Sequence, residues 1–284
     1  MFKRVAVIGV GFMGGSFALA CREAIGCEVF GIDINPQAVE KGKQLGVIQE
    51  GSTDLKSVRL FEPDLVMLAT PVRTFLPIAE VIKDHISKEC VVSDLGSVKG
   101  RLVYRLEEIL GERFVGGHPI AGTEKAGVEN SLKDLFRGKR FILTPTEKTH
   151  GEAKEKIKDL WTKIGSLVEE MDPYVHDFVF GVVSHLPHAV AFALMDAVER
   201  LSKEIDLFRY PGGGFRDFTR IAGSDPVMWR DIFLENSQEV VKAIEVFMSS
   251  LQRLREAIRE GKEEELTEYL RKASAKRRSL ELNS

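Results

Sequence analysis

A histidine in a predicted glycine-rich loop is the strongest candidate for proton chemistry in this sequence. His118 follows Gly116 and Gly117 and precedes Pro119, which restricts the backbone at the histidine. Because imidazole titrates near neutral pH, His118 can accept the proton of a hydroxyl group while hydride leaves the same carbon. A histidine in a loop is also often only structural, so the elements around it must decide between these two interpretations.

Two more histidines stand close together in the run Ser184-His185-Leu186-Pro187-His188. The spacing puts His185 and His188 on one helical face, and Pro187 either kinks that helix or begins a new one. No carboxylate or cysteine lies nearby at ligand spacing, which disfavours a metal pair. Packing in the core and contact with a substrate both remain open for these histidines.

Two arginines follow a glycine triplet at 212–214. Arg216 and Arg220 flank Asp217, and a guanidinium group can bind a carboxylate through two parallel hydrogen bonds. We therefore expect this segment to recognise a carboxylate of the substrate, although surface ion pairs would also explain the two arginines.

The elements that position these residues begin at the N-terminus. An apolar run at 4–8 leads into the glycine-rich turn 9–14, and a second apolar run at 28–32 ends at Asp33. The order is a strand, a turn, a helix and a second strand, with an acidic residue about 20 positions after the turn. This is the pattern of a dinucleotide-binding unit.

The glycines of the turn have separate roles in such a unit. Gly9 lets the chain turn sharply, Gly11 leaves room for a pyrophosphate, and Gly14 lets the helix pack closely on the strand. The helix N-terminus can then hold phosphate. Asp33 would bind the adenosine ribose and repel the extra phosphate of NADP, and Ile34 follows it where an arginine would receive that phosphate. The sequence therefore favours NAD, with predicted contacts from Gly9, Gly11, Phe12, Met13, Gly14 and Asp33.

Composition narrows the class of protein. With 284 residues, 44% of them hydrophobic, the chain is long enough for about two domains with a sizeable core. The formal net charge of -3 gives no electrostatic footprint for nucleic acid. We find no apolar stretch long enough to span a bilayer and no signal peptide, so we expect a soluble, cytoplasmic protein. Cys21, Cys27 and Cys90 lack paired metal spacing and are expected to be buried free thiols.

Apolar runs alternate with helical patterns through the first half of the chain, as in a doubly wound parallel sheet. The predicted strands that follow the first two cover 64–69, 90–94, 114–115, 140–143 and 166–171, and the predicted helices cover 75–86 and 152–164. Ligands bind beyond the carboxyl ends of such strands, so the segments that follow them are candidates for the site. These segments are Thr70-Pro71-Val72 beside the cofactor ribose, Gly96-Ser97-Val98-Lys99 with a hydroxyl and a cation near nicotinamide, and 116–124 with His118.

After residue 172 the strand patterns stop and helical periodicity takes over, which predicts two domains, 1–171 and 172–284. One apolar stripe recurs at steps of three and four along a long helix, and we expect a second copy of the chain to cover it in a homodimer. The basic run 271–278 is expected to be a solvated helix end rather than a nucleic-acid site. The stripe consists of Val240, Ile244, Phe247, Leu251, Leu254 and Ile258.

Five segments, taken in this order, resemble the prephenate dehydrogenase family, also called TyrA. They are GVGFMGGS at 9–16 with Asp33, DLGSVK at 94–99, GGHPIAGTE at 116–124, SHLPH at 184–188 and GGGFRDFTRIAGSDPVMW at 212–229. The resemblance runs over nearly the whole chain. It implies an α/β Rossmann-type doubly wound sheet followed by an all-α dimerisation domain.

The resemblance also implies a reaction and a role for each matching residue. Prephenate and NAD would yield 4-hydroxyphenylpyruvate, carbon dioxide and NADH in tyrosine biosynthesis, and no metal is needed. His118 would assist deprotonation of the ring hydroxyl, Ser97 would place that hydroxyl beside nicotinamide, and Arg220 would bind a substrate carboxylate. The other implied substrate contacts are Thr123, Ser184, His188, Gly213 and Asp217, with Gly213 and Asp217 expected to come from a partner subunit.

Three other activities retain part of this pattern. Arogenate dehydrogenase has the same fold and chemistry, and the neutral or cationic pocket groups lean toward the keto acid prephenate. A β-hydroxyacid dehydrogenase would carry a catalytic lysine on a helix after the cofactor domain, and a non-catalytic NAD sensor would not need His118. The chain begins at the first strand and ends soon after the last helix, so we expect no fused mutase or regulatory domain. Inhibition by tyrosine is then expected at or near the active site.

Overall fold

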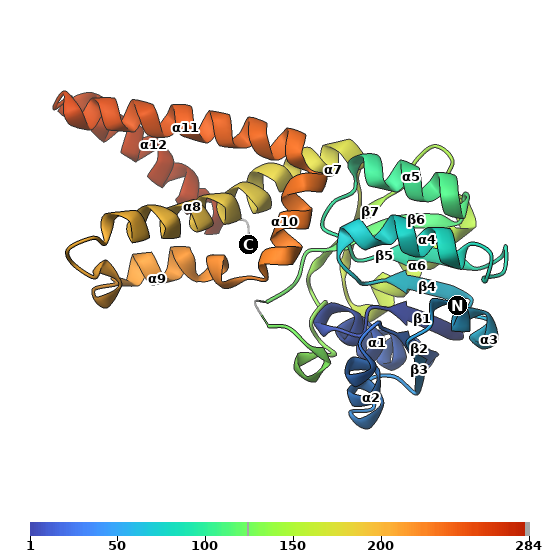
Figure 1. The fold of residues 1–284 in the computed structure, drawn as a ribbon. Helices are drawn as coiled ribbons and strands as arrows, with labels where there is room; N and C mark the ends of the chain where they lie inside the picture. The colour runs from blue at the N-terminus through green and yellow to red at the C-terminus, as the bar shows by residue number, and fades with distance from the viewer. Residues whose placement is uncertain (124, 282–284) are drawn as a thin grey trace. The chain divides into compact units, whose positions relative to one another are not determined.

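The computed structural model describes residues 1–123 and 125–281, which form two compact units, Met1–Ser237 and Gln238–Ser284. The first unit contains an eight-stranded sheet with the order β3-β2-β1-β4-β5-β6-β7-β8 (Figure 1). The strands are β1 (Arg4–Ile8), β2 (Glu28–Ile32), β3 (Glu50–Ser52), β4 (Leu65–Leu68), β5 (Val91–Asp94), β6 (Phe114–Pro119), β7 (Arg140–Thr144) and β8 (Leu167–Glu170). The helices of the first unit that flank the sheet are α1 (Phe12–Ile25), α2 (Pro36–Gln44), α3 (Val58–Phe61), α4 (Phe75–Ile82), α5 (Gly100–Leu110) and α6 (Gly151–Ile164).

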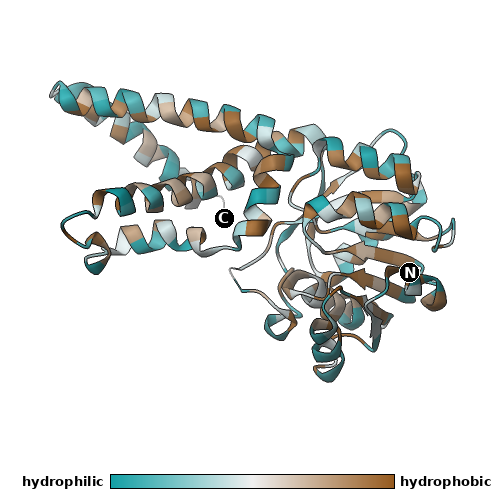
Figure 2. Ribbon diagram, in the orientation of Figure 1, coloured by the Kyte–Doolittle hydropathy of each residue, from teal (hydrophilic) through white to brown (hydrophobic). Residues whose placement is uncertain are grey.

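The central strands are apolar on both faces because helices cover both sides of the sheet. In β1, Val5 and Val7 join a core with α1 and α6, whereas Ala6 and Ile8 join a second core with α4 and α5. Figure 2 shows the strands as largely hydrophobic, while the covering helices alternate between hydrophobic and hydrophilic residues. This arrangement confirms the predicted doubly wound architecture.

Strand β6 changes partners along its length. Its first residues, Phe114 and Val115, pair in parallel with β5, and residues 116–119 pair antiparallel with β7. Strand β8 then runs parallel to β7. The end of β6 therefore extends beyond β5, and its backbone is held there by a strand of opposite direction.

His118 lies within β6, so the expectation that it stands in a loop is wrong. The two glycines before it serve packing rather than flexibility. A Cβ on Gly116 would lie 2.4 Å from Oγ1 of Thr144, and a Cβ on Gly117 would lie 2.3 Å from Cζ of Phe141. Since both glycines lack that atom, the side chains of β7 can pack directly across β6.

The other expected elements of this half are confirmed with small changes of boundary. The helix expected over 75–86 ends at Ile82, and the short edge strand β3 was not expected. Cys21, Cys27 and Cys90 are buried free thiols, as expected.

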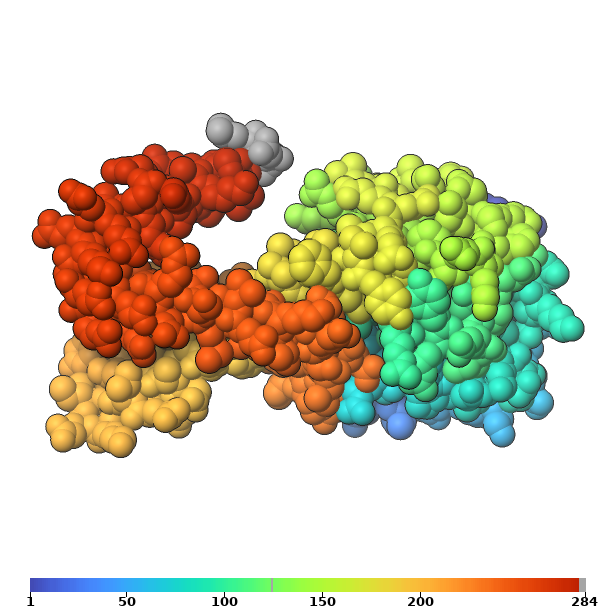
Figure 3. Space-filling model, turned by 90° about the horizontal axis from the view of Figure 1, so that it is seen from above, coloured from blue at the N-terminus to red at the C-terminus, as the bar shows by residue number. Residues whose placement is uncertain are grey.

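The helical segment begins at Asp172, whose side chain accepts hydrogen bonds from the amides of Tyr174 and Val175 and caps α7 (Pro173–Phe180). A π-helical turn, Gly181–His185, joins α7 to α8 (Leu186–Leu201), so Pro187 stands in the first turn of the new helix. Helix α7 packs on α5 (Figure 3). The first unit ends with α9 (Gly213–Thr219) and α10 (Pro226–Glu235).

The continuous helical run from α7 to α8 corrects the expectation that no apolar stretch is long enough to span a bilayer. Residues Pro173–Leu201 form 29 helical residues that are long and apolar enough to cross a membrane by length and composition. Several of their apolar side chains are exposed, among them Phe178 and Val183. The same run carries His176, Asp177 and His185 in a buried polar network, so its length and hydropathy alone are a weak argument for a membrane span.

The second unit consists of most of α11 (Ser237–Arg259) and of α12 (Glu263–Glu281). The expected apolar stripe lies on α11. Val240 is buried, but Leu251 is 53% exposed and Ile258 is 61% exposed. Ile244, Phe247 and Leu254 are half-buried, so two of the six stripe residues are exposed within one chain.

Candidate active site

The turn between β1 and α1 has the shape that a dinucleotide pyrophosphate requires. Gly9 has a φ of +105°, and a Cβ on it would lie 2.7 Å from the backbone of Ala69, which follows β4. A Cβ on Gly14 would lie 1.9 Å from the carbonyl oxygen of Gly9, whereas Gly11 faces open space. The turn lies where the strand order reverses, between β1 and β4, and it leads directly into the N-terminus of α1, where phosphate binding is favoured.

Asp33 stands at the end of β2 with its carboxylate fixed by backbone amides. Oδ2 accepts a hydrogen bond from the amide of Val10 at 2.8 Å, and Oδ1 accepts one from the amide of Asn35 at 2.9 Å. Each oxygen keeps a second lone pair for a ribose hydroxyl. The half-buried carboxylate is therefore preorganised beside the glycine turn.

Asp94, at the end of β5, joins the segments that carry Ser97 and His118. It accepts hydrogen bonds from the amide of Gly96 at 2.7 Å and from the amide of Gly117 at 3.2 Å, and it forms an ion pair with Lys99. Both side chains of the ion pair are 1% exposed. Burial lowers the pKa of Lys99, and Asp94 opposes that shift. The pair thus fixes the loop after β5 to the end of β6.

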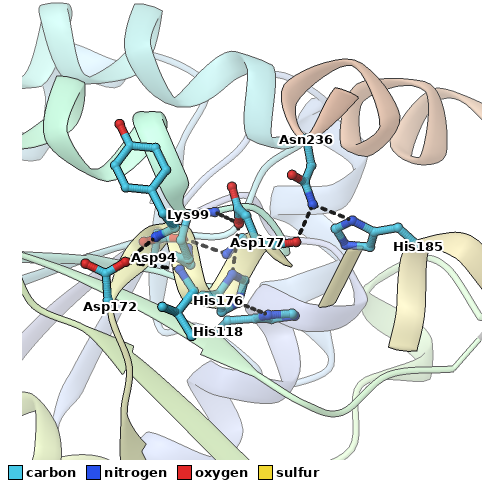
Figure 4. Close-up of polar contacts among 11 residues, drawn as sticks. Asp94, Lys99, His118, Asp172, His176, Asp177, His185 and Asn236 are labelled. Atoms are coloured by element: carbon cyan, nitrogen blue, oxygen red, sulfur yellow. Dashed lines mark hydrogen bonds and ion pairs between the residues drawn. The ribbon is translucent and has the colours of Figure 1, made fainter. Parts of the chain in front are cut away.

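His118 is the first member of a chain of three side chains (Figure 4). Its Nδ1 lies 2.8 Å from Nε2 of His176, and Nδ1 of His176 lies 2.9 Å from Oδ1 of Asp177. His176 and Asp177 belong to α7, 58 residues further along the chain. The ring of Phe180, one helical turn later, packs edge-on against His118 at 5.1 Å between centroids.

The histidines of this chain are held neutral. Burial lowers the pKa of His118 well below its usual 6.5, and positive charge on His176, Lys99 or His185 would lower it further. Burial likewise lowers the pKa of His176 to about 2. Burial raises the pKa of Asp177 to about 6, although hydrogen bonds from the backbone oppose the shift. Near neutral pH, His118 is therefore an unprotonated base.

His185 has a structural environment. Nδ2 of Asn236 lies 3.1 Å from Nδ1 of His185 and also donates to the carbonyl oxygen of Asp177 at 2.8 Å. Burial lowers the pKa of His185 to about 4. Asn236, which ends α10, therefore links the π-helical turn to α7.

His188 lies in a different environment, half-buried and stacked on Trp229 of α10 with ring centroids 3.6 Å apart. Its Nδ1 lies 2.9 Å from the carbonyl oxygen of Ser184, which leaves Nε2 for a ligand. Burial lowers the pKa of His188, and the positive charge of Arg220 lowers it further. Ser184 and His188 therefore form a neutral polar wall that is within electrostatic reach of the cation of Arg220.

Family comparisons agree with this geometry. A model described as the nucleotide-binding domain of prephenate dehydrogenase matches residues 17–170, and a model described as its dimerization domain matches residues 172–272. The chain belongs to the prephenate dehydrogenase family. Prephenate dehydrogenase of Bacillus subtilis is 35% identical over 99% of this chain and 77% of its own length.

Two solved structures of the family are similar over nearly their whole length. Prephenate dehydrogenase of Aquifex aeolicus, solved with hydroxyphenyl propionate and NAD+, is 55% identical and covers 99% of both chains with a TM-score of 0.96. Arogenate dehydrogenase of Synechocystis is 26% identical, covers 98% of this chain and 100% of its own, and has a TM-score of 0.82. The family fold is thus shared by proteins named for two related substrates.

The remaining predicted site residues lie in different environments. Ser97 lies between Asp94 and Lys99 in the loop after β5, whereas Lys99 itself is buried in the ion pair. Thr70 accepts a hydrogen bond from Thr74 at 2.7 Å. The side chain of Val72 is buried in a core and that of Pro71 is exposed. Thr123, Gly213 and Asp217 are exposed, and among the described residues none of them hydrogen-bonds His118; Glu124, the last residue of the GGHPIAGTE motif, lies outside the described residues.

Several polar residues around His118 and His185 escaped sequence reasoning. His176 and Asp177 were overlooked because they stand in an otherwise apolar helix, where Pro173-Tyr174-Val175 precedes them. An adjacent histidine and aspartate in such a helix would have been the signal. Asn236 gave no comparable signal, since its side chain contacts His185, 51 residues away in the sequence.

Proposed function

We propose that this chain is an NAD-dependent dehydrogenase that converts prephenate to 4-hydroxyphenylpyruvate and carbon dioxide. The observation that carries the proposal is the neutral, half-buried His118 at the carboxyl end of β6, held by His176 beside the loop of Ser97. Family membership supports the same reaction, because relatives named prephenate dehydrogenase align with 99% of the chain.

The cofactor that fits the first site is NAD. The positive φ of Gly9, the open space at Gly11 and the oriented carboxylate of Asp33 match pyrophosphate and ribose. When bound, NAD accepts the hydride. Asp33 would hold the ribose hydroxyls and disfavour the additional phosphate of NADP. The proposed cofactor contacts are Gly9, Gly11, Phe12, Met13, Gly14, Asp33, Thr70, Pro71, Val72, Ser97 and Lys99.

The chain's own residues handle one proton and one carboxylate. Nε2 of His118 would accept the proton of the ring hydroxyl as hydride leaves the same carbon, and would return it to that oxygen when loss of carbon dioxide makes the ring aromatic. Ser97 orients that hydroxyl. Arg220 binds a carboxylate beside the wall of Ser184 and His188. Thr123, Gly213 and Asp217 complete the proposed substrate contacts, the last two from a partner subunit.

Positioning supplies most of the catalysis in this proposal. Loss of carbon dioxide makes the substrate ring aromatic, which provides a large driving force without help from the protein. Holding donor and acceptor in a reactive geometry is worth about 7 to 11 kcal/mol in well-oriented systems. The rigid placement of His118 on a paired strand suits that task.

Domain organisation and assembly belong to the same proposal. We place the functional boundary between residues 171 and 172, where one family model ends and the next begins. The partly exposed stripe on α11 supports a homodimer in the cytoplasm, for which sedimentation should give twice the 31.7 kDa of one chain. Tyrosine should compete with prephenate; tight binding of tyrosine without competition would contradict that assignment.

The decisive test is NADH formation by the purified protein. We expect absorbance of NADH to rise with NAD and prephenate, and to rise more slowly with arogenate at equal concentration. Faster turnover of arogenate would assign the chain to the related substrate instead. No NADH with either compound would overturn the dehydrogenase proposal and leave an NAD-binding role.

A further inference from the structure

We propose that His176 and Asp177 are positioning residues that fix the tautomer of His118, so that its proton sits on Nδ1 and Nε2 is the free base. The inference rests on the proposed function, because it assigns roles around the base of that reaction. It concerns residues that neither contact the reacting atoms nor belong to the five motifs recognised in the sequence.

The three side chains allow one self-consistent arrangement of protons (Figure 4). Above about pH 6, Asp177 is a carboxylate and can only accept, so Nδ1 of His176 must carry a proton across the 2.9 Å contact. A neutral His176 then has a bare Nε2. That nitrogen must accept from Nδ1 of His118 across 2.8 Å, which leaves Nε2 of His118 without a proton.

The reverse tautomer of His118 would disrupt this series of hydrogen bonds. A proton on Nε2 of His118 would leave Nδ1 bare, and the 2.8 Å contact would then need a proton on Nε2 of His176. Neutral His176 would turn the lone pair of its Nδ1 toward the carboxylate oxygen of Asp177. Two lone pairs would then face each other in a buried site, where an unsatisfied polar contact is unfavourable.

Asp177 is itself held in place from three sides. Its Oδ1 also accepts from the amide of Lys99 at 2.8 Å, and its carbonyl oxygen accepts from Asn236. A Cβ on Gly100 would lie 2.4 Å from Oδ2, so glycine is needed there for the carboxylate to fit. Rotation of the carboxylate away from His176 would therefore cost the hydrogen bond from the amide of Lys99.

The charged groups around His118 and His176 favour the neutral form of both histidines. The buried ammonium of Lys99, in front of α5, disfavours positive charge on both His118 and His176, and His185 of the π-helical turn acts in the same direction. Asp94 neutralises Lys99 from the end of β5. With no second positive charge tolerated nearby, the tautomer of His118 is set by hydrogen bonding rather than by ionisation.

The experiment combines kinetics with a direct readout of the tautomer. Nitrogen-15 NMR of labelled protein distinguishes protonated from bare ring nitrogens, and His118→Asn identifies the signals of His118 by their loss. We expect the wild-type spectrum to show a protonated Nδ1 and a bare Nε2. A wild-type spectrum with the proton on Nε2 of His118 would overturn the inference whatever the His176 variants do.

Two substitutions of His176 provide the kinetic arm. His176→Phe removes the acceptor and should lower kcat about 100-fold while changing the KM for prephenate less than about threefold, because the base would then populate both tautomers and lose its orientation. His176→Gln offers a carbonyl oxygen to Nδ1 and should recover about tenfold of that loss. His85→Gln, at a histidine beyond α4, is the matched control and should leave kcat unchanged.

The outcomes separate this inference from the proposed function. Retention of kcat within about threefold in folded His176→Phe would overturn the positioning role while prephenate dehydrogenase activity stood. Absence of activity in the wild type would overturn the proposed function, and the NMR tautomer would still decide the inference.

Discussion

Replacing Gly117 by alanine tests whether packing between β6 and β7 holds the catalytic base in place. The new Cβ would lie 2.3 Å from Cζ of Phe141, whereas ordinary contact begins at about 3.4 Å, so about 1.1 Å must be gained. The ring of Phe141 is fully buried and stacked on Trp161 with centroids 3.8 Å apart. Since the ring has no space to retreat, β6 must shift and carry His118 with it.

A displacement of about 1 Å at a catalytic group costs about 100-fold in rate, or about 2.7 kcal/mol of transition-state stabilisation. We therefore expect Gly117→Ala to lower kcat by about that factor in the NADH assay. Gly122→Ala is the matched control, because its Cβ would meet open space. Gly117→Ala combined with Phe141→Leu should recover much of the loss. A folded Gly117→Ala enzyme with kcat within about threefold of wild type would refute the reasoning.

Three further measurements test the assigned roles. His118→Asn should lower kcat about 100-fold or more with little change in KM; weak loss of turnover with much weaker binding would make His118 a binding group. Arg220→Ala should raise the KM for prephenate about tenfold or more, with Arg200→Ala, at an exposed arginine of α8, as the control, and a normal KM would contradict the carboxylate assignment. Because burial depresses the pKa of His118 below 6.5 and the neutral form is the base, kcat/KM should stay level from about pH 8 to pH 6.5 and fall only at lower pH. A midpoint above about pH 7 would show that the base titrates without this depression.

The cofactor half of the molecule could be predicted because its signals are local. Gly14 packs against the carbonyl of Gly9, and Asp33 accepts a hydrogen bond from the amide of Val10, so both act within one strand-turn-helix unit of about 25 residues. The apolar runs of β1 and β4 also indicate strands that are buried on both faces.

The substrate half could be predicted only in part because its contacts join distant segments. The glycines at 116 and 117 suggested a loop. Glycine is common in flexible loops, but it is also required where a side chain such as that of Phe141 packs directly against the backbone, and the sequence does not distinguish the two cases. The partner of His118 lies 58 residues away, at His176 in an apolar helix whose pattern indicates only packing. Tertiary contacts of this kind produce no periodic pattern in the local sequence from which they could be predicted.

Because of the π-helical turn Gly181–His185, the number of residues between α7 and α8 matters for the site as much as their types do. A π-helical turn contains one residue more than the α-helical turn it replaces. Deleting one residue would turn α8 by about 100° relative to α7, because each residue of an α-helix advances by that angle. His188 would leave Trp229 while His176 stayed beside His118. The two ends of the site would then be out of phase, so single-residue deletions in this turn should be tolerated less well than most substitutions.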